Sequence, residues 1–464
     1  MDSCNLDVIG KDYKNFLIKN DLIIFPVISS ELGTSVAAAA GACITHPDNN
    51  RPIMGILYIS RIIDQWKKNW KIKIKNTLFH EITHILGFSY NFFSDLNMVI
   101  KEGNIYYINS TKVLEQAKKY FGCDNLPYPG VPLENQGGEG SARSHWEGRY
   151  MYGDYMNMKI SSETAISDIT LALLEDTGFY KVNYFSGGLF KFGKNKGCEF
   201  FTKKCIENDK ANFGEFCDLP KELKCTSSLT SKSSCYMHNY NFNIPYQYFS
   251  NTTLGGIYFT NFCPVTYEYG STSDNFPKHC QLGTSNLTQE YGEILGKESL
   301  CFISSLLPDN SQKNDNSKIS ICYGVQCDPI KKQIIIKIGS KNVICPEQGG
   351  EISNPTGFKG ILECPKYEEI CSSNDDLVCN EIFSCLDEAV KKNSYNYITE
   401  YYDYEGPSVA FGDDDYDADT YTNDEDDKDD EDDDNEIGII RPNNSYNINL
   451  DSSFLLACLI ILIC

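Results

Sequence analysis

The sequence is poor in histidine, with six in 464 residues, and no two of its cysteines stand in C-x-x-C spacing. It also has no basic patch of the kind that binds nucleic acid. The apolar run at 454–464 would span only about 16 Å as a helix, whereas the hydrocarbon core of a bilayer is about 30 Å thick. These absences argue against a nucleic-acid partner, a cysteine-ligated metal cluster and a membrane-spanning helix at this end.

Cysteine itself is abundant. Of the 20 cysteines, 16 lie between Cys123 and Cys385, a density that indicates disulfides formed in an oxidising compartment. Residues 1–16 contain no apolar run preceded by positive charge, so we expect the true N-terminus to lie upstream of this sequence. We therefore expect an extracellular or cell-surface protein. Four glycosylation sequons agree with secretion, at Asn109, Asn251, Asn286 and Asn443.

The net charge of −23 is concentrated in one segment. Residues 403–436 hold 18 acidic residues against the single Lys428, which leaves about −6 for the rest of the chain. Such a run repels itself and buries no apolar surface, so 391–442 is predicted to be a disordered stalk, with weak calcium binding as the alternative. Residues 443–464 combine small residues, a polar spacer and an apolar tail, which favours a glycolipid-anchor signal over a short tail anchor.

Hydrophobic patterns predict the first elements. Residues 20–29 and 51–60 are β-rich and bounded by turn residues, so they are predicted to be strands. The small apolar segment 35–44 fits a helix by propensity, or a strand whose small side chains let another backbone approach closely. Helical periodicity runs from 62 to 88, with Gly87 as a plausible end.

The remaining chain gives weaker signals. Residues 91–144 are rich in turn formers and predict mostly loop around a short helix near 111–120. A second helix is predicted over 161–180 from its Ser-x-Glu start and its glycine stop. From 198 to 385 the sequence shows no strong periodicity, which indicates a loop-rich domain held by disulfides.

The segment "TLFHEITHILGFSY" (77–90) carries two histidines four residues apart. On a helix these positions lie on one face, so His80 and His84 can bind one metal ion with Glu81 beside it. The glutamate is suited to take a proton from a water that zinc has acidified. A catalytic zinc needs three protein ligands, however, so a third donor is required.

The third donor must come from elsewhere in the chain. A compact extension of the motif places a histidine three residues after a glycine; Gly87 is present, but Tyr90 occupies that position. Among the few histidines, His145 in "SHWEGRY" is the remaining candidate. The others lie in a polar loop or in the cysteine-rich part and are expected to be solvated or structural: His46, His238 and His279.

The parts of one longer pattern are the two-histidine motif, a glycine, about sixty inserted residues, "HWE" and a methionine eleven residues after that histidine. This pattern resembles the leishmanolysin-type metzincins, a family of surface zinc proteases. Flanking matches are "DLIIFPVIS", "AAAAGACI" and "IMGILYIS" before the helix, and "LLEDTGFYKVNY" and "GKNKGCEFFTKKC" after it. The resemblance covers about 20–205 with specific motifs and extends more loosely to about 385.

The resemblance implies roles for individual residues. His80, His84 and His145 would hold one catalytic Zn²⁺, and Glu81 would be the general base. Met156 would form the Met-turn, a tight bend below the metal. By composition alone it fits ordinary core as well, and its neighbours Met151 and Met158 fit the spacing of the turn less well.

The resemblance also implies an architecture. The fold is expected to be α+β: a metzincin-type catalytic domain with a mixed sheet and an active-site helix, a helical lower subdomain and a disulfide-rich C-terminal domain. Its strand at 35–44 would be the edge that pairs with an extended peptide substrate. The expected divisions are 1–88 for the first catalytic subdomain, 89–197 for the third ligand and Met-turn, and 198–390 for the cysteine-rich domain.

The leading functional hypothesis is therefore a zinc-dependent endopeptidase that acts on proteins or peptides, with membrane attachment through the glycolipid anchor. A surface adhesion protein that uses the cysteine-rich domain is the alternative. A purely structural zinc would need a fourth protein ligand. No feature of the sequence indicates an oligomeric state.

Overall fold

The computed structural model of the chain describes residues 21–29, 32, 36–60, 71–138, 141–159, 164–182, 184, 190–268, 279–280, 291–296, 298–313 and 317–371. They form a mixed helix and sheet structure crossed by disulfides, which confirms the expected α+β class at that level. The acidic run, the C-terminal tail, the first part of the helix predicted from residue 62, and the sequons at Asn286 and Asn443 lie outside the described residues.

The first sheet has three strands, β1 (Ile23–Ser29), β2 (Ala38–Thr45) and β3 (Pro52–Ser60), in the order β1-β3-β2. Strand β3 is parallel to β1 and antiparallel to β2. The segment that fitted either a helix or a strand is thus a strand, and in the described sheet it forms an edge. Its side chains are small, and a neighbouring element packs closely against the sheet.

That element is helix α3 (Lys71–Ile85), which packs on the sheet. Gly55 of β3 allows the approach, because a Cβ at this position would overlap the side chain of Ile85. The helix ends where Gly87 takes a φ of 118°, a conformation that L side chains rarely adopt. The predicted glycine stop is confirmed.

Residues 91–144 are more regular than predicted. The structure contains a three-stranded sheet in the order β4-β5-β6, which the expectation of mostly loop did not include. Its strands have two to four residues, too short for a periodic signal to emerge among turn formers. The predicted short helix is present. The elements are α4 (Tyr90–Asp95), β4 (Val99–Glu102), β5 (Ile105–Ile108), α5 (Thr111–Phe121) and β6 (Val131–Pro132).

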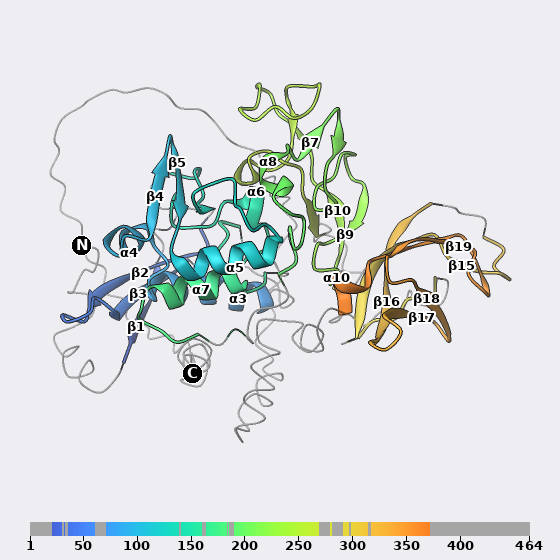
Figure 1. Ribbon diagram of the computed structural model, residues 1–464, viewed down its shortest axis with the longest axis horizontal. Helices are drawn as coiled ribbons and strands as arrows, with labels where there is room; N and C mark the ends of the chain where they lie inside the picture. The colour runs from blue at the N-terminus through green and yellow to red at the C-terminus, as the bar shows by residue number, and fades with distance from the viewer. Residues whose placement is uncertain are drawn as a thin grey trace, which may run out of the picture.

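The second predicted helix corresponds to α7, which spans Asp168–Asp176 and is shorter than the predicted 161–180. It begins late because Ser167 is its N-cap, with its hydroxyl accepting from the backbone N–H of Thr170 at 3.1 Å. Helices α5 and α7 lie side by side (Figure 1). The Asp176 carboxylate at the end of α7 accepts from the backbone N–H groups of Lys112 and Val113 at 2.8 and 3.1 Å.

One large hydrophobic core joins α3, α5, α7 and the chain around them. It runs from Phe79 to Val265, so it continues past residue 198, the predicted start of the cysteine-rich domain. Trp146 and Phe200 are fully buried in it. The segments on both sides of that boundary therefore share one packed interior.

Residues 198–268 consist of short elements held by disulfides. Cys123–Cys198, Cys205–Cys263 and Cys217–Cys235 lie in or border this region. The elements are α6 (Gly148–Met151), which precedes the region, α8 (Glu199–Thr202), β7 (Ile206–Glu207), β8 (Lys210–Ala211), β9 (Leu223–Cys225), β10 (Lys232–Cys235), β11 (His238–Asn239), β12 (Leu254–Gly255), η4 (Tyr258–Thr260) and β13 (Thr266–Glu268).

The chain from 299 to 371 forms a second sheet with its own core, in the order β18-β17-β16-β14-β21-β19 (Figure 1). The prediction of a loop-rich region without periodicity is wrong here. In "QIIIKI" every second residue is buried, a period that the neighbouring cysteines and turns obscure. The elements are β14 (Ser299–Ser304), β15 (Leu307–Pro308), β16 (Ile319–Asp328), β17 (Gln333–Ile338), β18 (Lys341–Cys345), β19 (Gly350–Ser353), β20 (Phe358–Lys359), β21 (Ile361–Cys364) and α10 (Tyr367–Cys371).

The structure confirms that the abundant cysteines form disulfides. Cys225–Cys301 connects β9 to β14, and so ties the region of short elements to the second sheet. Cys43 is disulfide-bonded as well. Three further bridges brace the second sheet, Cys280–Cys322, Cys327–Cys371 and Cys345–Cys364.

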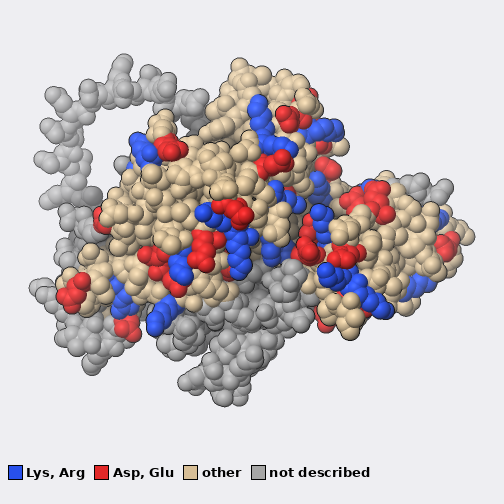
Figure 2. Space-filling view, in the orientation of Figure 1, with Lys and Arg blue, Asp and Glu red and all other residues tan. Residues whose placement is uncertain are grey.

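Charge is mixed over the described surface. Figure 2 shows acidic and basic side chains interspersed on the visible face, with neither sign dominating. This agrees with a chain whose excess negative charge is concentrated in 403–436. None of the helices within the described ranges combines the length and the apolar character needed to cross a bilayer.

We predict that Ile336→Ala lowers the free energy of unfolding by about 2–5 kcal/mol, because the fully buried side chain leaves a cavity in the second core. The matched control is Ile330→Ala, at a side chain that is 92% exposed, which should change stability by no more than about 0.5 kcal/mol. Thermal and denaturant unfolding of both variants measures the difference. Equal stabilities would contradict the assignment of this core.

Candidate metal centre

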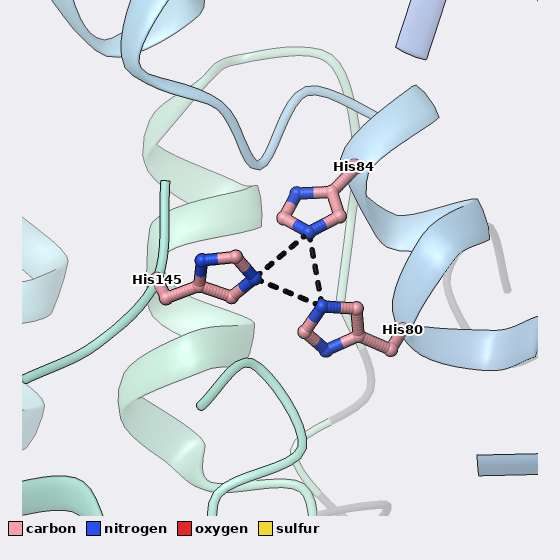
Figure 3. A group of neighbouring side chains, drawn as sticks. All are labelled: His80, His84 and His145. Atoms are coloured by element: carbon pink, nitrogen blue, oxygen red, sulfur yellow. Dashed lines mark hydrogen bonds between the residues drawn. The ribbon is translucent and has the colours of Figure 1, made fainter. Parts of the chain in front are cut away.

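Three histidines converge on one point (Figure 3). His80 and His84 project from successive turns of α3, and His145 approaches from the loop that precedes α6. The Nε2 atom of His80 lies 3.0 Å from each of the other two Nε2 atoms, and those two are 3.3 Å apart. His145 is 61 positions from His84 and 65 positions from His80 in the chain, and all three side chains share one small site.

The other nitrogen of each ring is engaged by backbone. The Nδ1 atoms of His80, His84 and His145 lie 2.5, 2.6 and 2.7 Å from the carbonyl oxygens of Tyr155, Phe88 and Ser141, respectively. A carbonyl only accepts, so each Nδ1 carries the hydrogen and donates it. Each Nε2 is then left with a lone pair. Three lone pairs facing one another repel, unless a cation lies between them.

Burial keeps the three rings neutral. It is the largest cause that lowers the pKa of His80 well below the ordinary value, and the charges of His84 and His145 add to it. Burial likewise lowers the pKa of His84 to about 4 and that of His145 to about 3. Neutral imidazole is the form that binds metals, so the rings stand ready as ligands near pH 7.

The donor set fits zinc. Zinc binds imidazole nitrogen at about 2.0–2.1 Å in tetrahedral geometry, which places ligand nitrogens about 3.3 Å apart, close to the separations found here. Within the described ranges these histidines are the one group of three or more metal-capable side chains close enough to share an ion. Three protein ligands is the number that catalytic zinc sites use, whereas structural zinc sites use four.

Glu81 lies beside this centre on α3 and is buried. Burial raises the pKa of its carboxyl group to about 8, and a hydrogen bond from the backbone of Ala40 acts in the opposite direction. Ala40 belongs to β2. The carboxyl group is therefore held between the metal-binding helix and the edge strand of the first sheet.

The segment around Met156 supports the centre from another side. Met156 is fully buried in the first core. Its backbone N–H donates to the Asp154 carboxylate at 2.7 Å, and its carbonyl accepts from Trp146 at 3.0 Å. The preceding residue, Tyr155, supplies the carbonyl that holds His80, so this turn fixes the orientation of a ligand directly.

Asp154 organises the turn. Its second carboxylate oxygen accepts from the Ser167 N–H and the Thr170 hydroxyl, at 3.2 and 2.9 Å. Burial raises the pKa of this carboxyl group to about 6, although the hydrogen bonds act in the opposite direction. Sequence reasoning missed Asp154, and the one available signal is its place two residues before the methionine.

A turn from the cysteine-rich region braces the loop that carries His145. Gln136 Nε2 donates to the Tyr258 carbonyl and to Asn261 Oδ1, at 2.6 and 2.8 Å. Asn261 is also hydrogen-bonded to the buried Glu147, two residues after the ligand. We name the segment 257–263 the bracing turn; the Cys205–Cys263 disulfide secures its end. The sequence gives no signal for the contact between Gln136 and Asn261, which are 125 positions apart.

The other histidines lie away from the centre. His46 is part of an exposed loop with 42% of its side chain accessible, and His238 lies in β11. His279 is buried, which lowers its pKa to about 4. Of the neighbouring methionines, Met151 is fully buried in the first core and Met158 packs against it.

The comparisons with known proteins agree with the geometry. The sequence model described as leishmanolysin matches residues 2–377. Leishmanolysin of Leishmania tropica is 27% identical over 369 residues, covering 75% of this chain and 54% of that protein. A leishmanolysin homolog of Crithidia fasciculata is 28% identical, with 77% and 56% covered.

A leishmanolysin-like peptidase of Drosophila pseudoobscura pseudoobscura is 26% identical over 424 residues, covering 74% of this chain and 61% of that protein. The chain therefore spans between half and two thirds of the length of these relatives. Because the family's sequence model matches more than half of the chain, the protein belongs to the leishmanolysin family.

Proposed function

We propose that this chain is a zinc-dependent endopeptidase. The observation that carries the proposal is the convergence of three Nε2 lone pairs whose rings are fixed by backbone carbonyls. Family membership supports it, since relatives carry the names leishmanolysin and leishmanolysin-like peptidase. Substrates are proteins or peptides.

His80, His84 and His145 are the proposed ligands of one Zn²⁺. When bound, zinc supplies Lewis-acid chemistry that polarises a peptide carbonyl and acidifies water. The three backbone carbonyls orient the rings and keep the hydrogen on Nδ1, so the lone pairs stay available.

Glu81 is the proposed general base. Its carboxyl group takes a proton from the attacking water and passes it to the leaving amine. Burial raises the pKa of this carboxyl group, which makes its ionised form a stronger base for the proton of the water. No side-chain nucleophile and no covalent intermediate is required.

Strand β2 is the proposed substrate-binding edge. Its partner β3 occupies one side of it, and the hydrogen bond from Ala40 places it next to Glu81. An extended peptide added to the other side would lie with its backbone along the base. In this arrangement the sheet and α3 form the upper part of a metzincin-type cleft, and the turn around Met156 together with α7 forms the lower part.

The location is also a proposal. Seven disulfides among the described residues support an oxidising compartment. The composition of 391–442 and 443–464 supports a stalk and a glycolipid anchor at the cell surface. The proposal keeps the division into catalytic parts at 1–88 and 89–197 and a cysteine-rich domain at 198–390, with the first core continuing across residue 198.

Removal of the third ligand tests the metal site. We expect His145→Ala to lose bound zinc and casein digestion, whereas His46→Ala should keep both because that ring lies in an exposed loop. Elemental analysis of the purified protein gives the zinc content. A chelator should stop digestion by the unmodified chain, and added zinc should restore it. Protein binding that survives chelation, with no digestion at any stage, would favour the adhesion protein instead.

Glu81→Gln separates the base from the ligands. The amide keeps the shape of the side chain but accepts no proton, so kcat should fall by about 10²–10⁴-fold while zinc remains bound. The control is Glu102→Gln at an exposed position of β4, which should leave kcat unchanged. Full peptidase activity of the Glu81 variant with stoichiometric zinc would refute its role.

The bracing turn gives a third prediction. Gln136→Ala removes both hydrogen bonds to the turn, so the loop that carries His145 loses support and zinc affinity should fall by about tenfold. Competition with a calibrated chelator measures the affinity. Gln326→Ala on the exposed side of β16 is the matched control. Unchanged affinity in the Gln136 variant would show that the brace plays no part in positioning the ligand.

A further inference from the structure

Two cations and two tyrosines gather beside the metal centre. The Arg143 guanidinium lies 4.5 Å from the ring centroid of Tyr90 and 5.6 Å from that of Tyr106. Lys101 Nζ lies 5.2 Å from the centroid of Tyr106, and the two rings meet edge to face at 5.4 Å. We name these four residues the cationic cluster.

The cluster is attached to the ligands from two sides. Arg143 is two residues before His145, in the loop whose Ser141 carbonyl holds that ring. Tyr90 is two residues after Phe88, whose carbonyl holds His84. The two attachments meet, because the backbone N–H of Tyr90 donates to the hydroxyl of Ser144 at 3.2 Å.

The backbone of Arg143 presents its side chain in an unusual conformation. Its φ is 69°, in the left-handed region that a non-glycine residue enters at a cost in conformational energy. Such strain gathers at sites of function. The cost is offset in the surrounding loop, where the Arg143 N–H donates to the Glu134 carbonyl at 2.8 Å.

The cluster has positive charge without a matching anion. Several lysines elsewhere on the described surface meet carboxylates, as Lys318 meets Glu351 and Glu363. No carboxylate in the described ranges lies within ion-pair distance of Lys101 or Arg143. A hydrogen bond from Lys101 is the largest cause that lowers the pKa of Tyr106, and Arg143 and Tyr90 contribute further hydrogen bonds. The local potential therefore favours negative charge.

We propose that the cationic cluster is a specificity subsite that binds a carboxylate of the peptide substrate. The inference rests on the proposed endopeptidase function and adds a substrate class to it. The guanidinium fork is matched to a carboxylate in shape and charge, Lys101 adds a second cation, and the tyrosine rings hold the guanidinium in place. The carboxylate is either an acidic side chain near the scissile bond or the C-terminus of a short peptide.

The test uses the zinc-loaded full chain and quenched peptides that differ by Glu or Gln at one position at a time, on both sides of the scissile bond. We expect kcat/KM for the glutamate peptide to exceed that for its glutamine partner by about tenfold at one position. The ratio should decrease with added salt, because the cluster is partly exposed. A second arm compares short peptides with a free or an amidated C-terminus, which distinguishes the two sources of the carboxylate.

Arg143→Gln should bring the ratio close to one. Lys101→Gln, in a short exposed strand, should reduce the ratio as well, and it serves as the test if the arginine variant does not fold. Lys119→Gln on the exposed face of α5 removes the same charge elsewhere and should keep the original ratio. If the unmodified protein cleaves acidic and neutral peptides equally in both arms, or if Arg143→Gln keeps the preference, the subsite is refuted while the peptidase remains. If no peptide is cleaved at all, the proposed function itself fails.

Discussion

The structure of the metal centre depends on three hydrogen bonds that do not involve the metal-binding nitrogens. The carbonyls of Phe88, Ser141 and Tyr155 each take the hydrogen of one imidazole. A neutral ring has one N–H and one lone pair, so fixing the first fixes the second. The three lone pairs meet within 3.3 Å of one another, an arrangement that is unfavourable in isolation. The fold tolerates this repulsion, and it is the main physical reason to expect a cation there.

Each carbonyl belongs to a segment where the chain leaves regular structure. Phe88 follows the turn that ends α3, Ser141 lies in the loop before His145, and Tyr155 lies in the turn before Met156. A carbonyl inside a helix is taken by the helix itself, so only irregular backbone offers free acceptors at these angles. The Asp154 carboxylate, which accepts from three donors, replaces the secondary structure that this turn lacks.

The sequence predicted the parts of the centre that follow from local geometry. Two histidines at i and i+4 share a helix face wherever the helix lies, and with so few histidines in the chain His145 was the obvious remaining donor; the structure brings all three rings together. The carbonyls could not be predicted, because every residue has one. The bracing turn could not be predicted either, since Gln136 and Asn261 meet only through tertiary folding. Short strands such as β4 and β5 were not predicted, because four residues are too few to show a periodic pattern.

The loop that carries His145 raises a final question, namely why its supports are polar. Glu134, Glu147 and Arg149 are all buried behind it, and burial is the largest cause that raises the pKa of both carboxyl groups. Apolar residues there would cost less to bury. They would, however, let the loop slide, because hydrophobic contact has no direction. A ligand nitrogen must be held to a fraction of an ångström, and hydrogen bonds from two sides supply that direction. The buried polar layer thus lowers the stability of the fold but fixes the position of His145, the one proposed ligand that does not lie on a helix.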